Sequence, residues 1–146
     1  MKKIILLIFI FLLCGCKDKY ITCNININND VLNYKLDGEY KIYYKKSYVI
    51  KIEKIEKYSS SDIDVIKYLE ESKNIELDNL NQLYGGYSYK IDRNKLNLDL
   101  KTDINIKNVD IEKMLKNDYI NKYYVNNEKL TLGGIKLFYE SKGAKC

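Results

Sequence analysis

The chain has 146 residues, which suits one domain built around one hydrophobic core. It contains 25 Lys and Arg, 20 Asp and Glu and four Cys, but no His, Pro or Trp. Without His, catalysis by a Ser-His-Asp triad or a Cys-His pair and metal binding through imidazole are excluded, and the cysteine spacings do not suit an all-thiolate zinc site. The sequence therefore assigns no catalytic residue, and we expect no metal and no cofactor.

Residues 1–15 have the pattern of a secretory signal peptide, two lysines followed by an apolar stretch at residues 4–13. The stretch is too short to span a membrane, which takes about 20 apolar residues. The segment 13–16, Leu-Cys-Gly-Cys, resembles the lipobox of bacterial lipoproteins. This resemblance implies cleavage between Gly15 and Cys16 and attachment of a diacylglycerol to the Cys16 thiol. A plain signal peptide or an uncleaved anchor is the alternative.

The expected mature protein is a lipidated tether, residues 16–20, followed by a single domain, residues 21–146. Two acyl chains give stable attachment, so we expect the protein at the cell membrane, facing outside the cytoplasm. Loss of Lys2 and Lys3 lowers the formal net charge from +5 to +3, which gives little reason to expect binding of nucleic acid or of anionic lipids. The expected partners are the membrane, through the anchor, and an unknown envelope or extracellular protein, and the expected state is a monomer.

Two cysteines, Cys23 and Cys146, remain in the domain after this processing. Cys23 lies in phase with Ile21 and Ile25, on the buried face of a predicted strand. Cys146 follows a predicted helix that packs on the same core. A disulfide between them closes a loop of about 120 residues, worth about 4–5 kcal/mol in the chain-entropy model. Two inert buried thiols are the alternative. A redox role is disfavoured because no Cys-x-x-Cys is present.

The first part of the domain alternates apolar and polar residues with period two, as strands do. The predicted strands are residues 21–28, 31–36, 40–44 and 48–52. Turns are expected at residues 28–30 and 37–38. Residues 45–47 either separate two strands or interrupt one long strand. The apolar phase shifts between Ile52 and Ile55, which predicts a β-bulge.

The serine-rich segment 59–62 changes the period and predicts a helix to about Lys73, with Ser61 as its N-cap. A second short helix is expected to follow it as far as Tyr84, where Gly85 ends it. The apolar faces of these helices are formed by Ile63, Ile66, Leu69, Leu77, Leu80 and Leu83.

A hairpin follows, with arms at residues 87–91 and from Leu96 onward and a turn at residues 92–94. Its second arm alternates strictly, which indicates a sheet with one buried and one solvated face and hence antiparallel strands. The residues on the apolar side of this arm are Leu96, Leu98, Leu100, Ile104 and Ile106.

Two helices close the chain, at residues 109–115 and 132–142. The second has Thr131 as its N-cap and Gly143 after its C-terminus, and Gly133-Gly134 weaken its first turn by about 2 kcal/mol. The predicted fold class is therefore α+β, an antiparallel sheet with helices packed on one face.

This layout resembles the YehR-like small lipoproteins of bacteria, a family of unknown function. The resemblance spans the chain and implies the α+β fold and the lipid anchor, but no catalytic residues. It rests on residues 13–16, Thr22-Cys23, residues 96–106, Thr131-Leu132 and residues 141–146.

Several clusters invite a chemical interpretation, and an ordinary structural role explains each better. Asp62 and Asp64 lack the glycine and glutamate of a calcium loop and suit helix capping. Residues 84–87, Tyr-Gly-Gly-Tyr, lack the downstream lysine of a phosphate-binding loop. Asp99 and Asp103 lie about 13 Å apart on the solvated face of a strand, where carboxylates are usually solvated.

The remaining clusters are basic and aromatic. Their lysines could contact anionic headgroups or cell-wall polymers, but a solvated edge or face is the better interpretation. Their tyrosines could form a ligand platform, but sheet packing explains them better. The residues are Lys45, Lys46, Lys51, Lys54 and Lys57, and Tyr40, Tyr43, Tyr44 and Tyr48.

The main functional hypothesis is a non-enzymatic, lipid-anchored envelope protein whose exposed sheet face or loops bind a partner. A closed core without a pocket favours it. The alternative is a carrier of a small ligand or carbohydrate, favoured by an apolar cavity lined by Tyr87, Tyr89 and helix residues. An extracytoplasmic hydrolase is the third class, and two carboxyl groups converging in a cleft would favour it.

Overall fold

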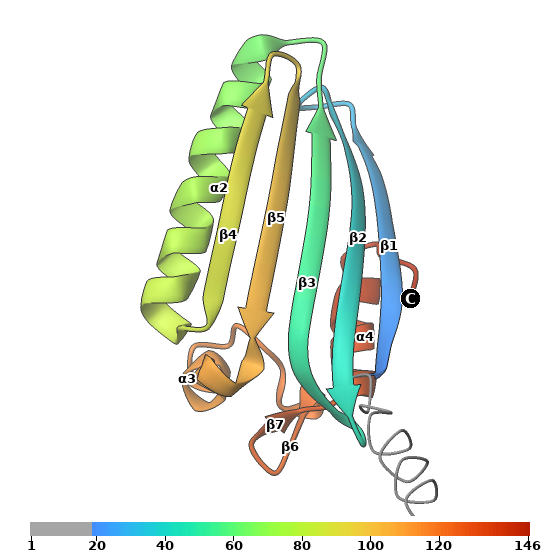
Figure 1. Ribbon diagram of the computed structural model, residues 1–146, viewed down its shortest axis with the longest axis vertical. Coiled ribbons are helices and arrows are strands. Elements are labelled where there is room, and N and C mark those ends of the chain that lie inside the picture. The colour runs from blue at the N-terminus through green and yellow to red at the C-terminus, as the bar shows by residue number, and fades with distance from the viewer. Residues whose placement is uncertain (1–18) are drawn as a thin grey trace, which may run out of the picture.

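A computed structural model describes residues 19–146. The expected signal peptide, the cleavage site at Gly15 and Cys16 and the lipidated Cys16 itself lie outside these residues. Within the described part, no helix combines the length and apolar character needed to cross a membrane. The chain forms a five-stranded sheet in the order β1-β2-β3-β5-β4, in which every neighbouring pair is antiparallel (Figure 1).

The sheet strands are β1 (Lys19–Asn29), β2 (Tyr34–Lys45), β3 (Tyr48–Ser59), β4 (Tyr87–Asn94) and β5 (Asn97–Asn105). The helices are α2 (Ile63–Tyr84), α3 (Ile111–Lys116) and α4 (Leu132–Glu140). Short 3-10 turns at Ile106–Asn108 and Lys122–Tyr124 and a small hairpin of β6 (Val125–Asn126) and β7 (Lys129–Leu130) complete the described chain.

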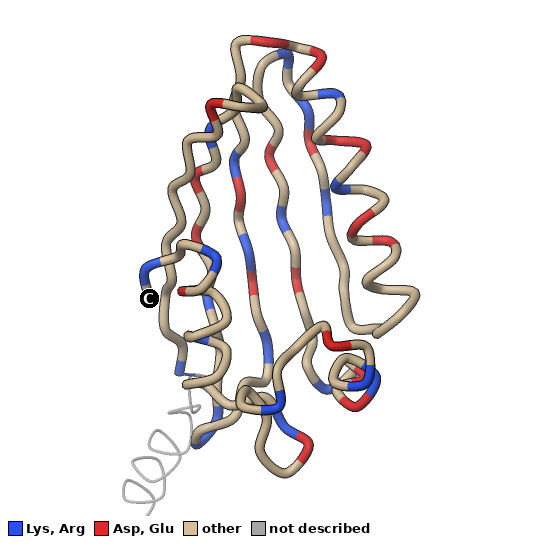
Figure 2. Tube along the Cα trace, turned by 180° about the vertical axis from the view of Figure 1, so that it is seen from behind, with Lys and Arg blue, Asp and Glu red and all other residues tan. Residues whose placement is uncertain are grey.

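The long helix α2 and the shorter helix α4 lie on one face of the sheet, and the other face is open. Helix α2 covers β4 and β5, whereas α4 lies behind the half of the sheet that contains β1 and β2 (Figure 1). The view from behind shows the two helices on the same face near opposite edges of the sheet, with strands visible between them (Figure 2). The predicted α+β class, with helices packed on one face of an antiparallel sheet, is confirmed.

The predicted turn at residues 37–38 is wrong, because β2 runs straight through it. The chain turns earlier, at residues 30–33, where Asn33 has a φ of 52°. Gly38 stands opposite Ile25 of β1, and a Cβ added to Gly38 would lie 2.7 Å from Ile25 Cγ2. The glycine therefore serves close packing between two strands, not a change of direction.

The predicted bulge between Ile52 and Ile55 is also misplaced. Pairing of β3 is regular there, and Ile55, 48% exposed, lies on the open face. The irregularity occurs beside the β2–β3 turn, where Tyr43 pairs with Lys51 but Tyr44 pairs with Val49. Residues 46–47 form that turn, so the interruption in the sequence separates two strands.

The two helices predicted between residues 61 and 84 are one continuous helix, α2, of 22 residues. Its N-cap is Asp62, not Ser61: the Asp62 side chain accepts a hydrogen bond from the Asp64 backbone N–H at 2.8 Å. Ile63 and Leu83 were expected on the buried face, but they are 42% and 45% exposed and do not belong to it. The buried residues of the helix are Ile66, Leu69, Leu77 and Tyr84.

The β4–β5 hairpin turns at residues 95–96, two residues later than predicted. Leu96 is consequently 42% exposed in the turn instead of facing the core. The rest of the alternating pattern holds, and the buried side chains of β5 are Leu98, Leu100, Thr102 and Ile104. Helix α3 begins later than predicted, at Ile111, where Asp110 is the N-cap.

The C-terminal segment is fastened to the edge strand β1 by a disulfide and by backbone hydrogen bonds. Cys23 and Cys146, 123 positions apart, are joined, and their Cα atoms are 3.9 Å apart. The backbones of Asn24 and Lys145 exchange two hydrogen bonds of 2.8 and 2.7 Å. These contacts follow α4 directly, so they hold the end of that helix against the sheet.

The start of α4 is fixed as tightly as its end. Thr131 is the N-cap, as predicted, and accepts a hydrogen bond from the Gly134 backbone N–H at 3.0 Å. Leu132 N–H donates to the Ser47 carbonyl at 2.9 Å, which ties the helix to the β2–β3 turn. A Cβ at Gly134 would overlap the Tyr124 backbone, so this glycine permits a close approach.

A groove between α2 and α4 as the candidate site

A groove crosses the helix-covered face of the sheet between α2 and α4, and it encloses about 400 Å³. Its floor comes from inward-facing residues of β1, β2 and β3. One wall is α2, and the other is the last turn of α4 with the residue Lys142 that follows it. The polar and aromatic lining, which differs from an ordinary core, includes Tyr40, Lys54, Glu56, Tyr58, Glu76 and Tyr139.

Glu56 of β3 is the central polar group of the floor. Its side chain faces the helices and the residue is only 5% exposed. The Tyr40 hydroxyl donates a hydrogen bond of 2.7 Å to Glu56 Oε1, and Lys54 Nζ lies 3.6 Å from the same oxygen. Both contacts are to Oε1. A carboxylate can accept several hydrogen bonds, so the Glu56 carboxyl can also accept one from a ligand in the groove.

Lysines lie over the tyrosine rings on either side of Glu56. Lys54 Nζ is 5.1 Å from the centre of the Tyr40 ring, and Lys73 Nζ of α2 is 5.9 Å from the centre of the Tyr58 ring. Lys73 also pairs with Glu76 at 2.6 Å. The groove therefore contains two ammonium–carboxylate pairs, one on the sheet and one on α2.

The α4 wall contributes aromatic surface. The ring of Tyr139 lies 4.9 Å from that of Tyr40 and 5.3 Å from that of Phe138. Because α4 is held by the Cys23–Cys146 disulfide, the position of this aromatic wall depends on that bond.

Burial keeps the phenol groups of the groove protonated. It is the main reason that the pKa values of Tyr40, Tyr58 and Tyr139 lie well above the usual tyrosine value, and the carboxyl of Glu56 raises them further. The Tyr40 hydroxyl is therefore a permanent hydrogen-bond donor at physiological pH.

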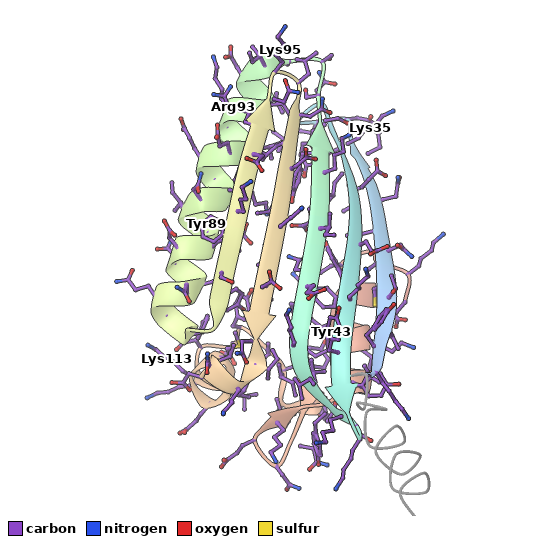
Figure 3. All side chains as sticks on the ribbon, in the orientation of Figure 1. Lys35, Tyr43, Tyr89, Arg93, Lys95 and Lys113 are labelled. Carbon is purple, nitrogen blue, oxygen red and sulfur yellow. A yellow bond between two sulfur atoms is a disulfide. The ribbon has the colours of Figure 1, made fainter. Side chains whose placement is uncertain are left out.

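The four tyrosines considered as a ligand platform do not gather at one place. Tyr40 lies in the groove, but Tyr43 lies on the open face, where its hydroxyl donates to Glu53 at 2.8 Å (Figure 3). Tyr48 lies beneath Lys129 near the β2–β3 turn. Tyr44 is half-buried on β2, where it pairs with Val49, the residue that follows Tyr48.

Tyr87 and Tyr89, the residues expected to line a ligand cavity, are not part of the groove lining. Tyr87 is half-buried beneath the α2 layer, and the Tyr89 hydroxyl donates to Asp78 of α2 at 2.6 Å. The groove lies instead over β1, β2 and β3, because α2 covers β4 and β5.

Most of the other residues considered for chemistry in the sequence, namely the aspartates, glycines and lysines, have the ordinary structural roles that the sequence analysis preferred. Asp103 faces the open side of the sheet and pairs with Lys51 at 3.1 Å. It lies four positions along the strand from Asp99, so the two carboxyl groups do not converge. Gly85 and Gly86, with φ of 70° and 80°, form the α2–β4 connection. Of the lysines on β3, Lys54 alone lines the groove, whereas Lys51 and Lys57 lie on the open face. Among the described residues no cluster of acidic or cysteine side chains could hold a metal ion.

The groove residues that the sequence reading missed are Glu56, Tyr58, Glu76 and Tyr139. A signal existed for Glu56: it is in phase with Ile52 and Tyr58, so strand periodicity places a charged residue on the apolar face. A charge on a buried face is unusual and indicates either a buried pair or a site.

Comparisons with solved structures show which fold this is. The NMR structure of the Escherichia coli YehR protein matches with a TM-score of 0.56 and 17% identity, over 88% of this chain and 91% of that one. A protein from Streptococcus pneumoniae TIGR4 matches with a TM-score of 0.51 and 15% identity, over 88% and 86% of the two chains. The chain therefore has a YehR-like fold. No known protein-family pattern matches the chain, and no curated protein matches its sequence.

The Tyr40–Glu56 hydrogen bond can be compared with a matched bond on the open face. Tyr40→Phe removes a donor from a buried carboxyl group, and we expect it to lower the free energy of unfolding by about 1–3 kcal/mol. Tyr43→Phe removes the equivalent donor from Glu53, which water can replace, and we expect a loss below about 1 kcal/mol. Urea unfolding of both variants measures the difference. Equal losses would contradict the description of Glu56 as a desolvated group.

Proposed function

We propose that this protein is a lipid-anchored binding protein of the cell envelope, and that its groove between α2 and α4 holds a small polyhydroxylated ligand such as a sugar. The observation that carries the proposal is the groove itself, whose floor holds the buried Glu56 carboxyl beside the Tyr40 hydroxyl and the Lys54 ammonium group. Its volume of about 400 Å³ is in the usual range of small-molecule sites.

The lining of the groove suits a neutral ligand with many hydroxyl groups. Lys54, Lys73 and Lys142 nearly balance Glu56 and Glu76, so the site offers hydrogen bonds in both directions without a large net charge. Tyrosine rings provide flat apolar surfaces against which the C–H faces of a sugar ring pack. A strongly charged ligand would leave one of these groups unpaired.

The open sheet face supports partner binding less well than the groove supports a ligand. Several of its charges already pair with each other: Lys51 contacts both Glu53 and Asp103, at 2.5 and 3.1 Å. The hydrogen bond from Lys51 is the main reason that the pKa of Glu53 lies below its usual value. Displacing such pairs would cost a partner as much electrostatic energy as it gained.

A hydrolase is the weakest of the three classes. Glu56 and Glu76 both line the groove, but each is engaged by its own lysine, Lys54 and Lys73. We therefore propose binding without chemistry.

Membership of the YehR-like lipoproteins, with lipid on Cys16, is part of the proposal. It is supported by the lipobox-like segment 13–16 and by the YehR-like fold of residues 19–146. The strand β1 begins at Lys19, so the proposed anchor lies three positions before the sheet.

The anchor is tested by the intact mass of the native protein extracted from membranes, measured with and without reductant. The expected mass is that of residues 16–146 plus lipid, and it increases by two hydrogens on reduction because Cys23 and Cys146 are joined. An unlipidated mass would contradict the anchor, and an unchanged mass on reduction would contradict the disulfide in the native protein.

The ligand proposal is tested by titrating isotope-labelled protein with glucose, N-acetylglucosamine and myo-inositol while its amide NMR signals are recorded. At least one probe is expected to shift signals of groove residues such as Glu56 and Tyr139. Glu56→Gln is expected to weaken that binding about tenfold, because a charge-assisted hydrogen bond is lost.

Glu53→Gln is the matched control, since it makes the same change on the open face of the same strand. It is expected to leave the affinity unchanged. Shifts confined to the open face, or no shifts with any of the three probes, would contradict the proposal.

A further inference from the structure

The end of the molecule at which β1 begins carries a cluster of lysines. Lys19 pairs in register with Tyr44, so the start of β1 lies beside the β2–β3 turn that contains Lys45 and Lys46. Hairpin β6–β7 lies at the same end, as do α3 and the first turn of α4 (Figure 1). Figure 2 shows basic segments at this end, together with acidic segments on α3 and in the β6–β7 hairpin.

Four of these lysines surround one hollow of about 540 Å³. They are Lys45, Lys46, Lys107 and Lys129, and Glu128 is the one acidic residue in the lining. The floor is apolar and includes Val49, Ile50 and Ile106. We call this surface the basic end. An apolar hollow with a rim of ammonium groups resembles, in chemistry, the complement of a phospholipid headgroup and its glycerol backbone.

The lysines of the basic end are gathered around one hollow, whereas other described lysines without an ion pair, such as Lys35 and Lys95, lie at the opposite end of the sheet (Figure 3). Lysines that form ion pairs are Lys41, Lys51, Lys54, Lys67, Lys73 and Lys90. Within residues 19–146, none of the four around the hollow has a carboxylate within ion-pair distance, and Lys129 Nζ instead lies 5.6 Å from the centre of the Tyr48 ring. Their charge is therefore available to an external anion.

The opposite end of the sheet has no such excess. There Asp30, Asp62 and Asp64 lie in the same region as Lys35 and Lys95, which Figure 3 labels at that end. Charge is thus distributed unevenly along the long axis, although the net charge of the processed chain is small. A field of this kind orients a protein near a charged surface.

We propose that the basic end is a contact surface for anionic lipid headgroups, which holds the domain upright on the membrane with the end of β1 towards the bilayer. Only the choice of this end rests on the proposed anchor at Cys16. The attraction itself is a property of the folded domain and does not need the lipid, so the two proposals can fail separately.

The test uses a chain that begins at Lys17 and therefore has no lipid. The sheet, its covering helices and the disulfide all lie within residues 19–146, so this chain retains the described fold, which circular dichroism checks. Co-sedimentation is measured with vesicles of pure phosphatidylcholine and with vesicles containing 30% phosphatidylglycerol. Binding is expected with phosphatidylglycerol alone, and it is expected to weaken as salt rises.

Two triple variants with the same loss of charge separate position from net charge. Replacing Lys45, Lys46 and Lys129 with Gln is expected to weaken partitioning on the order of a hundredfold, from about 1 kcal/mol per lysine. Replacing Lys35, Lys57 and Lys95 with Gln at the far part of the sheet is expected to change it less than about threefold. Equal losses in the two variants, equal binding to both kinds of vesicle, or no binding to either would overturn the proposal.

Discussion

The structure depends on the attachment of a short C-terminal helix to an edge strand. Helix α4 has nine residues and two glycines in its first turn, so it is too short and too weak to be stable alone. It is held at its start by Thr131 and the β2–β3 turn, and at its end by the Cys23–Cys146 disulfide and the Asn24–Lys145 backbone pair. The aromatic wall of the groove therefore exists because these attachments exist.

Charged side chains are accommodated differently on the two faces of the sheet. On the open face, charged side chains pair across strands in water, as Lys51 does with Asp103, and each pair contributes little. On the covered face, Glu56 is buried, and its partners Tyr40 and Lys54 satisfy one oxygen. The same alternation of side chains that builds the core thus also places one acceptor inside a groove that two helices leave uncovered.

Sequence periodicity predicted the fold class and the strands because it depends on local alternation, which is strongest in Leu98, Leu100 and Ile104. It failed where tertiary packing determines the local structure. Asp37-Gly38 is a typical turn sequence, but Gly38 lies inside a strand opposite Ile25. The groove was not predictable, because the gap between α2 and α4 depends on where each helix packs. The sequence indicated Lys45 and Lys46 as possible headgroup contacts, but a solvated edge was preferred. Net charge says nothing about position, and Lys107 and Lys129, which complete the basic end, are far from Lys45 in sequence.

The most direct test of this account is amide hydrogen exchange of the oxidised and the reduced protein. If the disulfide holds the groove wall, reduction will accelerate exchange in α4, and at the amides of Asn24 and Lys145, while β4, β5 and α2 keep their protection. Unchanged exchange in α4 would show that packing alone positions the wall. A uniform increase over the whole sheet would show that the helix is not a separately anchored element, and either result would contradict the account.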